Sequence, residues 1–107
     1  MAEIARCDRQ DTVASPDGTG DCCAYPTTQH TDEGSSDFFV GGFGVVRQGD
    51  AMTTHNNPEP DCCTPHTPRL EGGSATFFVN GKPVARKGDS YGGDHPISSG
   101  DSTFIVG

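Results

Sequence analysis

The sequence predicts an all-β protein built from three similar β-hairpins, and three observations lead to that fold class. The first is a repeat, because residues 38–50 align without a gap on residues 77–89, thirty-nine positions further along. The second is composition, with 15 Gly and 8 Pro in 107 residues and almost no helical spacing of apolar residues. The third is that residues 100–107 begin the repeat again. Such units share one core, since none buries its apolar face alone.

Each full copy of the repeat has the pattern of a β-hairpin. Residues 38–40 and 77–79 both read Phe-Phe-Val, a run that favours strands. Gly41-Gly42 and Asn80-Gly81 follow these runs and favour the positive φ angles of two-residue turns. Side chains alternate between the two faces of a strand, so the second Phe of each run is expected to point away from the Val that follows it.

The third hairpin is predicted to form from the two ends of the chain. Residues 100–107 match the start of the repeat, and residues 4–8 resemble its return strand, with Asp8 aligned on Asp50 and Asp89. Pairing residues 1–8 with residues 100–107 would close three hairpins around a pseudo-threefold axis. We therefore predict one domain, 1–107, with repeat units of about 23–50, 62–89, and 95–107 completed by 1–8.

Three polar stretches, 9–33, 51–72 and 90–99, connect the hairpins and are expected to be long ordered loops. All three leave from turns on one side of the predicted hairpins, so they should meet at one end. They contain every His and all Cys except Cys7. The candidate metal ligands are Cys22, Cys23 and His30 in the first connector, His55, Cys62, Cys63 and His66 in the second, and His95 in the third.

A small, loop-rich chain usually needs a metal or a disulfide to stabilise it. No apolar run is long enough to span a bilayer and no signal peptide is visible, so we expect synthesis in a reducing cytosol. There, Cys mixed with His favours a tetrahedral metal site, which needs four donors. A disulfide from Cys22 or Cys23 to Cys62 or Cys63, alone or alongside a metal, is the alternative.

Composition also bears on partners and on catalysis. The net charge of −8 speaks against nucleic acid, whose phosphates need clustered Lys and Arg. We expect no enzyme activity, because Glu is scarce and no Ser stands in a nucleophile arrangement with His and Asp. Arg6, Arg47 and Arg86 recur once per unit, either as a solvated strand face or as contacts to a partner. The rival interpretation is a small metal-dependent enzyme or a stand-alone metal-binding module.

Residues 82–89, Lys-Pro-Val-Ala-Arg-Lys-Gly-Asp, resemble the Pro-Ala-Ala-Arg element of the PAAR-repeat proteins, and the resemblance runs through all three repeats. It implies a small cone with a triangular base and a metal near the apex. It also implies a structural role, as the tip that caps a trimeric β-helical spike and sharpens it for membrane penetration. Such spikes belong to type VI secretion machines and phage tail baseplates, both contractile injection systems.

The same resemblance implies partners, location and ligands. One tip would bind one trimeric spike protein and meet the target membrane during puncture, with effector proteins as further candidate partners and no nucleic acid. The protein would be made in the cytoplasm, assembled into a virion or secretion apparatus, and delivered outside the cell. One zinc ion, with iron as the alternative, would be held by Cys23, His55, His66 and His95. His66 lies in the family's C-x-x-H spacing after Cys63.

Overall fold

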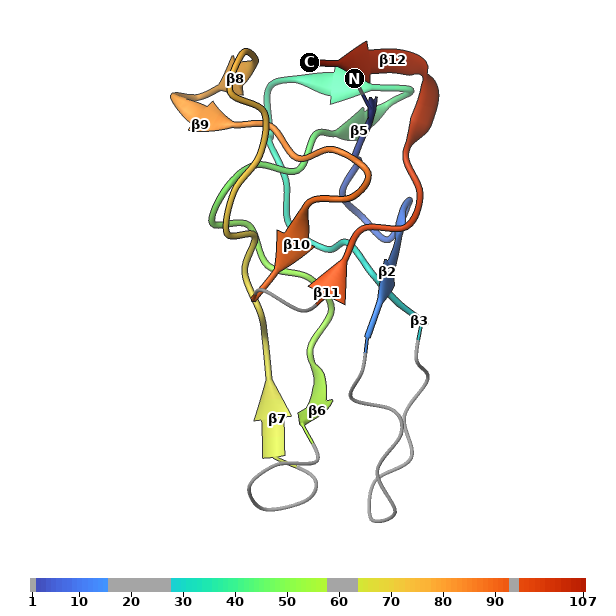
Figure 1. The fold of residues 1–107 in the computed structure, drawn as a ribbon, viewed down its shortest axis with the longest axis vertical. Helices are drawn as coiled ribbons and strands as arrows, with labels where there is room; N and C mark the ends of the chain where they lie inside the picture. Colours follow the sequence, from blue (N-terminus) through green and yellow to red (C-terminus); the bar gives the residue numbers. More distant parts are fainter. Residues whose placement is uncertain (1, 16–27, 58–63, 93–94) are drawn as a thin grey trace.

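The computed structural model describes residues 2–15, 28–57, 64–92 and 95–107. This part of the chain is all-β, without a helix, and its strands pair two by two in antiparallel fashion (Figure 1). The body is elongated, with extents of 40 × 23 × 22 Å. The strands are β1 (Ala2–Ile4), β2 (Thr12–Ala14), β3 (Thr28–His30), β4 (Phe39–Val40), β5 (Phe43–Gly44), β6 (His55–Asn57), β7 (Thr64–His66), β8 (Phe78–Val79), β9 (Lys82–Pro83), β10 (Ser90–Tyr91), β11 (His95–Pro96) and β12 (Asp101–Val106).

The two ends of the chain pair with each other, as the sequence predicts. β1 runs antiparallel to β12, with Ala2 opposite Val106 and Glu3 opposite Ile105. The register shifts between Glu3 and Ile4, where a bulge bends the ladder. Figure 1 accordingly shows the N- and C-terminal labels side by side at one end of the molecule.

Two further hairpins lie at this end, β4–β5 and β8–β9. Gly41 and Gly42 form the first turn with φ angles of 62° and 87°, and Asn80 and Gly81 form the second with 55° and 75°. Both central residues of each turn thus have the positive φ that tight hairpin turns require. The predicted alternation is confirmed on each outer strand, because the Phe that begins β4 or β8 is exposed and the following Val is buried.

A closed circuit of backbone hydrogen bonds joins the segments that follow these hairpins. Ala5 N donates to Ala85 O at 3.1 Å, Ala85 N to Val46 O at 2.8 Å, and Val46 N to Ala5 O at 3.0 Å. All three residues are fully buried, so each bond is shielded from water. The circuit ties the first, middle and last thirds of the chain directly to one another.

The apolar core consists of two clusters, and the three residues of this circuit belong to the second one. Val side chains dominate the first, which lies among the hairpins, and the second extends toward the connectors. Full burial of one such side chain stabilises the folded state by about 1.5–3 kcal/mol, so each member of these clusters contributes noticeably to the free energy of unfolding. The first cluster contains Ile4, Val40, Val45, Val79, Val84 and Val106. The second contains Ala5, Cys7, Val13, Val46, Met52, Leu70, Ala85, Tyr91 and Ile97.

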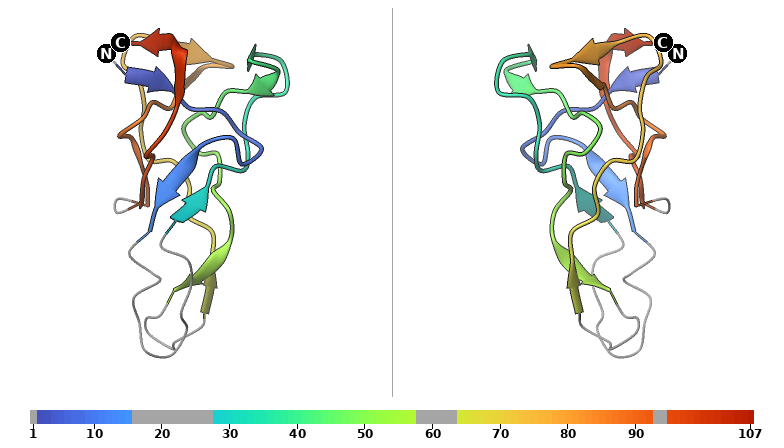
Figure 2. Two further views of the ribbon diagram at one scale, coloured as in Figure 1. Left: turned by 90° about the vertical axis from the view of Figure 1, so that its right-hand side faces the viewer. Right: turned by 90° about the vertical axis from the view of Figure 1, so that its left-hand side faces the viewer.

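The connectors differ from the predicted loops, because their described parts form short antiparallel strand pairs. β2 pairs with β3, β6 with β7, and β10 with β11. Isolated bridges such as Val13 to Ile97 and Leu70 to Tyr91 link one connector to the next. Their alternating burial, with Val13 and Gln29 inward and their neighbours outward, favours strands over loops. In Figures 1 and 2 these pairs lie away from the chain termini.

Candidate functional site

The described parts of the connectors bring two of the four predicted metal ligands together. The rings of His66 in β7 and His95 in β11 lie with their centroids 5.5 Å apart. His95 is only 2% exposed, and its backbone N donates to Ser90 Oγ at 3.0 Å, which fixes the β10–β11 turn. The backbone of His55 lies directly opposite His66 in the β6–β7 pair. Two imidazoles from different connectors are therefore neighbours.

The sulfur ligands that the sequence predicts are cysteines of the first two connectors. Cys23, and with it Cys22, Cys62 and Cys63, lies outside the described residues. Within the part of the chain that the structure describes, no group of three or more His, Cys, Asp or Glu side chains could hold a metal ion. His30 ends β3, where its backbone pairs with Thr12. The predicted ligand set stays a prediction.

Two buried groups of the second apolar cluster are held in their neutral forms. Burial raises the pKa of the Cys7 thiol to about 11, so this free cysteine stays protonated at neutral pH. Burial also raises the pKa of the fully buried Tyr91 well above its usual value. Among the described residues, the Tyr91 hydroxyl has no hydrogen-bond partner. Neither group is activated as a nucleophile or base.

Each recurring arginine closes its own turn by a two-pronged contact with an aspartate. Arg47 donates from its backbone N and Nε to Asp50 Oδ2, at 2.8 and 3.0 Å, and from Nη2 to Oδ1 at 3.1 Å. Arg86 repeats these contacts with Asp89 at 2.7, 3.0 and 3.1 Å. Such forked pairs are strong because both charges are hydrogen-bonded. Arg47 and Arg86 thus stabilise the turns of the fold. The sequence had suggested instead a solvated strand face or contacts to a partner.

The contacts of the third arginine, Arg6, show that Asp11 is the counterpart of Asp50 and Asp89 in the N-terminal segment. Arg6 pairs with Asp11 at 2.7, 3.2 and 3.1 Å, whereas the sequence alignment had placed Asp8 at the position of Asp50 and Asp89. Asp8 is exposed and has a φ of 56°, and Arg9 follows with 63°. Two extra residues thus lengthen this turn, a feature that alignment by residue type could not detect.

The end of the molecule that carries the termini presents large exposed hydrophobic side chains. Phe39, Phe78 and Ile105 are 55%, 53% and 45% exposed, and they occupy the same step of their three hairpins. The residues one step earlier are partly buried and pack against the Val-rich cluster. Their rings form a triangle, with centroid distances of 5.6 Å for Phe38–Phe77, 6.4 Å for Phe38–Phe104 and 5.8 Å for Phe77–Phe104.

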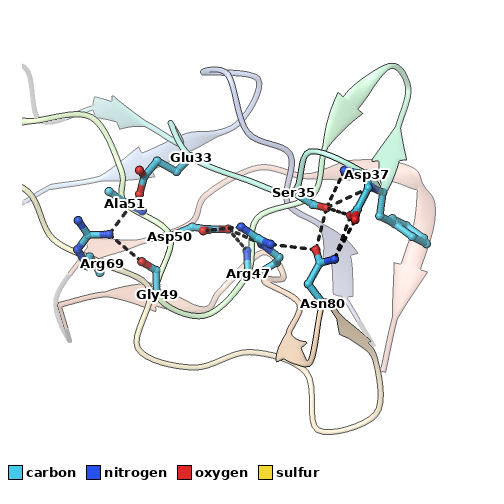
Figure 3. A network of polar contacts seen from close by, with 10 residues as sticks. Glu33, Ser35, Asp37, Arg47, Gly49, Asp50, Ala51, Arg69 and Asn80 are labelled. Carbon is cyan, nitrogen blue, oxygen red and sulfur yellow. Dashed lines mark hydrogen bonds and ion pairs between the residues drawn. The ribbon is translucent and has the colours of Figure 1, made fainter.

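A polar clamp joins the first two hairpins beside this surface (Figure 3). Asn80 Oδ1 accepts from Arg47 Nη1 at 2.9 Å. The Ser35 hydroxyl, which has a single proton, lies 2.8 Å from Asp37 Oδ1 and 3.1 Å from Asn80 Oδ1. Asn80 Nδ2 donates to both carboxylate oxygens of Asp37, at 3.1 Å each. The bonds from Ser35 and Asn80 lower the pKa of Asp37, which is therefore ionised at neutral pH. Sequence reasoning missed this clamp, because Asn80 lies 33 to 45 residues away from its three partners in the chain.

The next hairpin interface uses the same kinds of donors on a different acceptor. Ser74 Oγ and Arg86 Nη1 both donate to the carbonyl oxygen of Gly107, the latter at 3.2 Å. At the remaining interface Arg6 Nη1 lies 3.5 Å from Asp101 Oδ2. Each turn arginine thus also reaches a neighbouring segment at the hairpin end.

The described residues contain no helix capable of crossing a membrane. No protein-family model matches the chain, and no curated protein matches it.

Proposed function

We propose that this protein is a structural tip that caps a trimeric β-helical spike, as in a phage tail baseplate or a type VI secretion machine. One observation carries the proposal. Three large apolar side chains, Phe39, Phe78 and Ile105, are exposed at the same step of three hairpins at one end of the molecule. Exposed apolar side chains gathered in this way are typical of a docking surface.

The number three favours a trimeric partner. A spike of three identical chains presents the same surface three times, and a single chain that caps it needs three similar contacts of its own. The closed circuit of bonds among Ala5, Val46 and Ala85 supports this interpretation, since it relates the three segments in the same cyclic order. We infer a pseudo-threefold cone whose base is the hairpin end.

Apolar contact alone would give a modest affinity. Each of these side chains is about half exposed, so covering it contributes about 1 kcal/mol, half of what full burial would give. The outer edges of three two-stranded hairpins supply the rest, because strands of the spike can add to them through backbone hydrogen bonds. The base would thus continue the sheets of the spike.

At the opposite end we propose one structural zinc ion, with iron as the alternative, bound by Cys23, His55, His66 and His95. The proximity of the His66 and His95 rings supports the site, and thiolate with imidazole is a donor set that zinc favours. A bound ion would crosslink the connectors. Four protein ligands leave no open position, which favours a structural role over catalysis.

In this setting the tip is made in the cytoplasm, assembled into the virion or secretion apparatus, and delivered outside with the spike. The cone would bear the load when the target membrane is punctured, and effector proteins are further candidate partners. Mechanical load at the apex would pass through the connectors into the hairpin end.

The proposal is tested by mixing the full chain with a trimeric β-helical spike fragment and measuring the mass of the complex by light scattering. We expect one copy of this chain per three spike chains. Replacing Phe39 and Phe78 by Ser should weaken binding by at least about tenfold. Ser102→Ala, at an exposed position on the same strand as Ile105, is the matched control and should bind normally. A complex with equal numbers of the two chains, or binding unaffected by the Phe replacements, would contradict the proposal.

A further inference from the structure

Each of the three hairpins has an outer backbone edge, and the hydrogen-bond ladder shows which residue presents it. In an antiparallel pair of strands, hydrogen-bonded and non-hydrogen-bonded residue pairs alternate. Val45 N donates to Phe38 O at 3.1 Å, so the next pair, Phe39 with Gly44, is a non-hydrogen-bonded one. The two residues of such a pair turn their N–H and C=O groups away from each other. Phe39 therefore presents both groups on the outer side of β4.

The other two hairpins repeat this arrangement. Phe78 lies opposite Pro83, and Ile105 lies opposite Glu3, at the same step as Phe39. Proline fits the non-hydrogen-bonded position of β9, because it has no N–H to donate. Within the described ranges, no backbone group outside the ladders bonds to Phe39, Phe78 or Ile105, which we call the edge residues.

The inner edges of the same hairpins are already occupied. The carbonyl groups opposite the edge residues point into the body, where each accepts a backbone N–H from the following segment. These bonds are Cys7 N to Gly44 O at 2.8 Å, Gln48 N to Pro83 O at 2.9 Å and Lys87 N to Glu3 O at 2.8 Å. Figure 1 shows β8 and β12 at the extreme end of the molecule, with β9 nearer to the connectors. The outer edges therefore face away from the body along its long axis.

Side chains confine each outer edge to a single residue. The next outward N–H group lies two positions before each edge residue, and a side chain of the same hairpin binds it. Asp37 N donates to Ser35 Oγ at 3.2 Å, Thr76 N to Ser74 Oγ at 3.1 Å and Thr103 N to Asp101 Oδ1 at 2.8 Å. A long unpaired edge would recruit other chains indiscriminately, whereas an edge one residue wide offers too little backbone for that.

We propose that the three edge residues recognise a trimeric spike together, each pairing with one spike strand through one N–H and one C=O group. This inference rests on the proposed function and specifies its contact. Two hydrogen bonds are too few to offset the freedom lost on association, so a single strand does not bind by itself. Three strands of one rigid trimer share that cost, because the second and third contacts form within one complex. The hairpin end thus selects a threefold arrangement of strand edges and not a side-chain sequence.

The first experiment measures amide hydrogen exchange in the full chain by NMR, alone and then with a trimeric β-helical spike fragment. In the free chain the amides of the edge residues should exchange at nearly the rate of an unfolded chain. Those of Phe38 and Phe77, which donate to Ser35 and Ser74 Oγ at 3.1 and 3.0 Å, should exchange at least about tenfold more slowly. Slow exchange at the edge residues of the free chain would overturn the proposal.

The spike fragment separates this proposal from the function on which it rests. Bound spike should slow exchange at all three edge residues by at least about tenfold. Binding that slows none of them, or only one, would overturn this proposal and leave the proposed function standing, whereas a fragment that does not bind would overturn both. A single spike-strand peptide should show no binding at about 1 mM. A peptide that binds as tightly as the trimer would refute the need for three contacts.

Backbone N-methylation tests the contact directly. N-methylated Phe78 keeps its ring and carbonyl group but loses the outward N–H, so spike binding should weaken by about tenfold while the urea midpoint stays the same. N-methylated Phe77 is the matched control, because its N–H bonds Ser74 Oγ inside the protein, and its loss should lower the urea midpoint. Normal spike binding by the chain methylated at Phe78, or a loss of stability equal to that of the control, would contradict the proposal.

Discussion

The two ends of this molecule achieve order in different ways. At the hairpin end, Val-rich packing, a ring of Phe side chains and a closed circuit of backbone bonds hold the chain to itself. At the connector end, the described strands are two or three residues long, much like β4, β5, β8 and β9, but they are rich in His, Asn and Thr. Strands this short are marginal without further support. Burial stabilises the hairpin end, and at the connector end we propose that a bound metal adds a crosslink.

The largest effect should follow from removing that crosslink. We expect chelation, or replacement of Cys23, His55, His66 or His95 by Ala, to release the metal, because structural zinc contributes on the order of 10 kcal/mol to small domains. Amide hydrogen exchange should then rise in β6, β7 and β11 while β1 and β12 stay protected. Unchanged exchange and an unchanged melting point after chelation would contradict the proposed metal site.

The next effect tests the packing of the hairpin end. Gly44→Ala would place a Cβ 2.0 Å from the Ser35 carbonyl oxygen, which neither backbone can relieve cheaply. We expect a loss of about 3 kcal/mol in the free energy of unfolding, measured by urea denaturation. Gly72→Ala is the matched control, because nothing lies within 4 Å of its Cβ and its φ is ordinary. Equal stabilities of the two variants would show that the hairpin end is looser than described.

A smaller effect separates turn pairs from surface pairs. Asp89→Asn removes the charge from a pair whose side chains are 28% and 16% exposed, and should cost about 2 kcal/mol because Arg86 loses its partner in a partly desolvated site. Glu33→Gln affects a pair at 62% and 52% exposure and should cost under about 0.5 kcal/mol. Thermal melts of both variants measure the difference. Similar costs would mean that burial does not set the strength of these pairs.

The smallest effect concerns the second apolar cluster. Tyr91→Phe removes a buried hydroxyl that has no partner among the described residues, so stability should stay the same or rise by about 1 kcal/mol. Burial already keeps the phenol neutral by raising its pKa, so the variant changes no charge. Urea denaturation is again the measurement. A loss above that size would show that the hydroxyl is bonded to a group outside the described residues.

Much of the hairpin end could be predicted from the sequence, since its signals are local. Gly41-Gly42 and Asn80-Gly81 specify two-residue turns, and the matching of residues 100–107 to the repeat predicted that β1 pairs with β12. The role of Asp11 could not be predicted, because two residues with positive φ lengthen a turn without leaving a distinct residue pattern. The contacts of Asn80 depend on three residues far away in the chain.

The connectors were harder to predict. Their polar composition indicated loops, yet short strand pairs form there, and Val13, Met52, Leu70 and Ile97 in or beside these pairs each contribute one side chain to a shared cluster. Such isolated apolar residues produce no period that a sequence window detects. Of the candidate ligands, His66 and His95 lie together, while the positions of the cysteines stay a prediction.

The pairing of β1 with β12 has a consequence for biosynthesis. The partner of β1 is β12, Asp101–Val106, so the ladder between them forms only after all the segments that separate them have been translated. Until then Phe38 and Phe77 lack the third ring, and the Val-rich cluster is open on one side. The hairpin end of a nascent chain therefore stays open to proteases and to aggregation until Val106 has emerged from the ribosome.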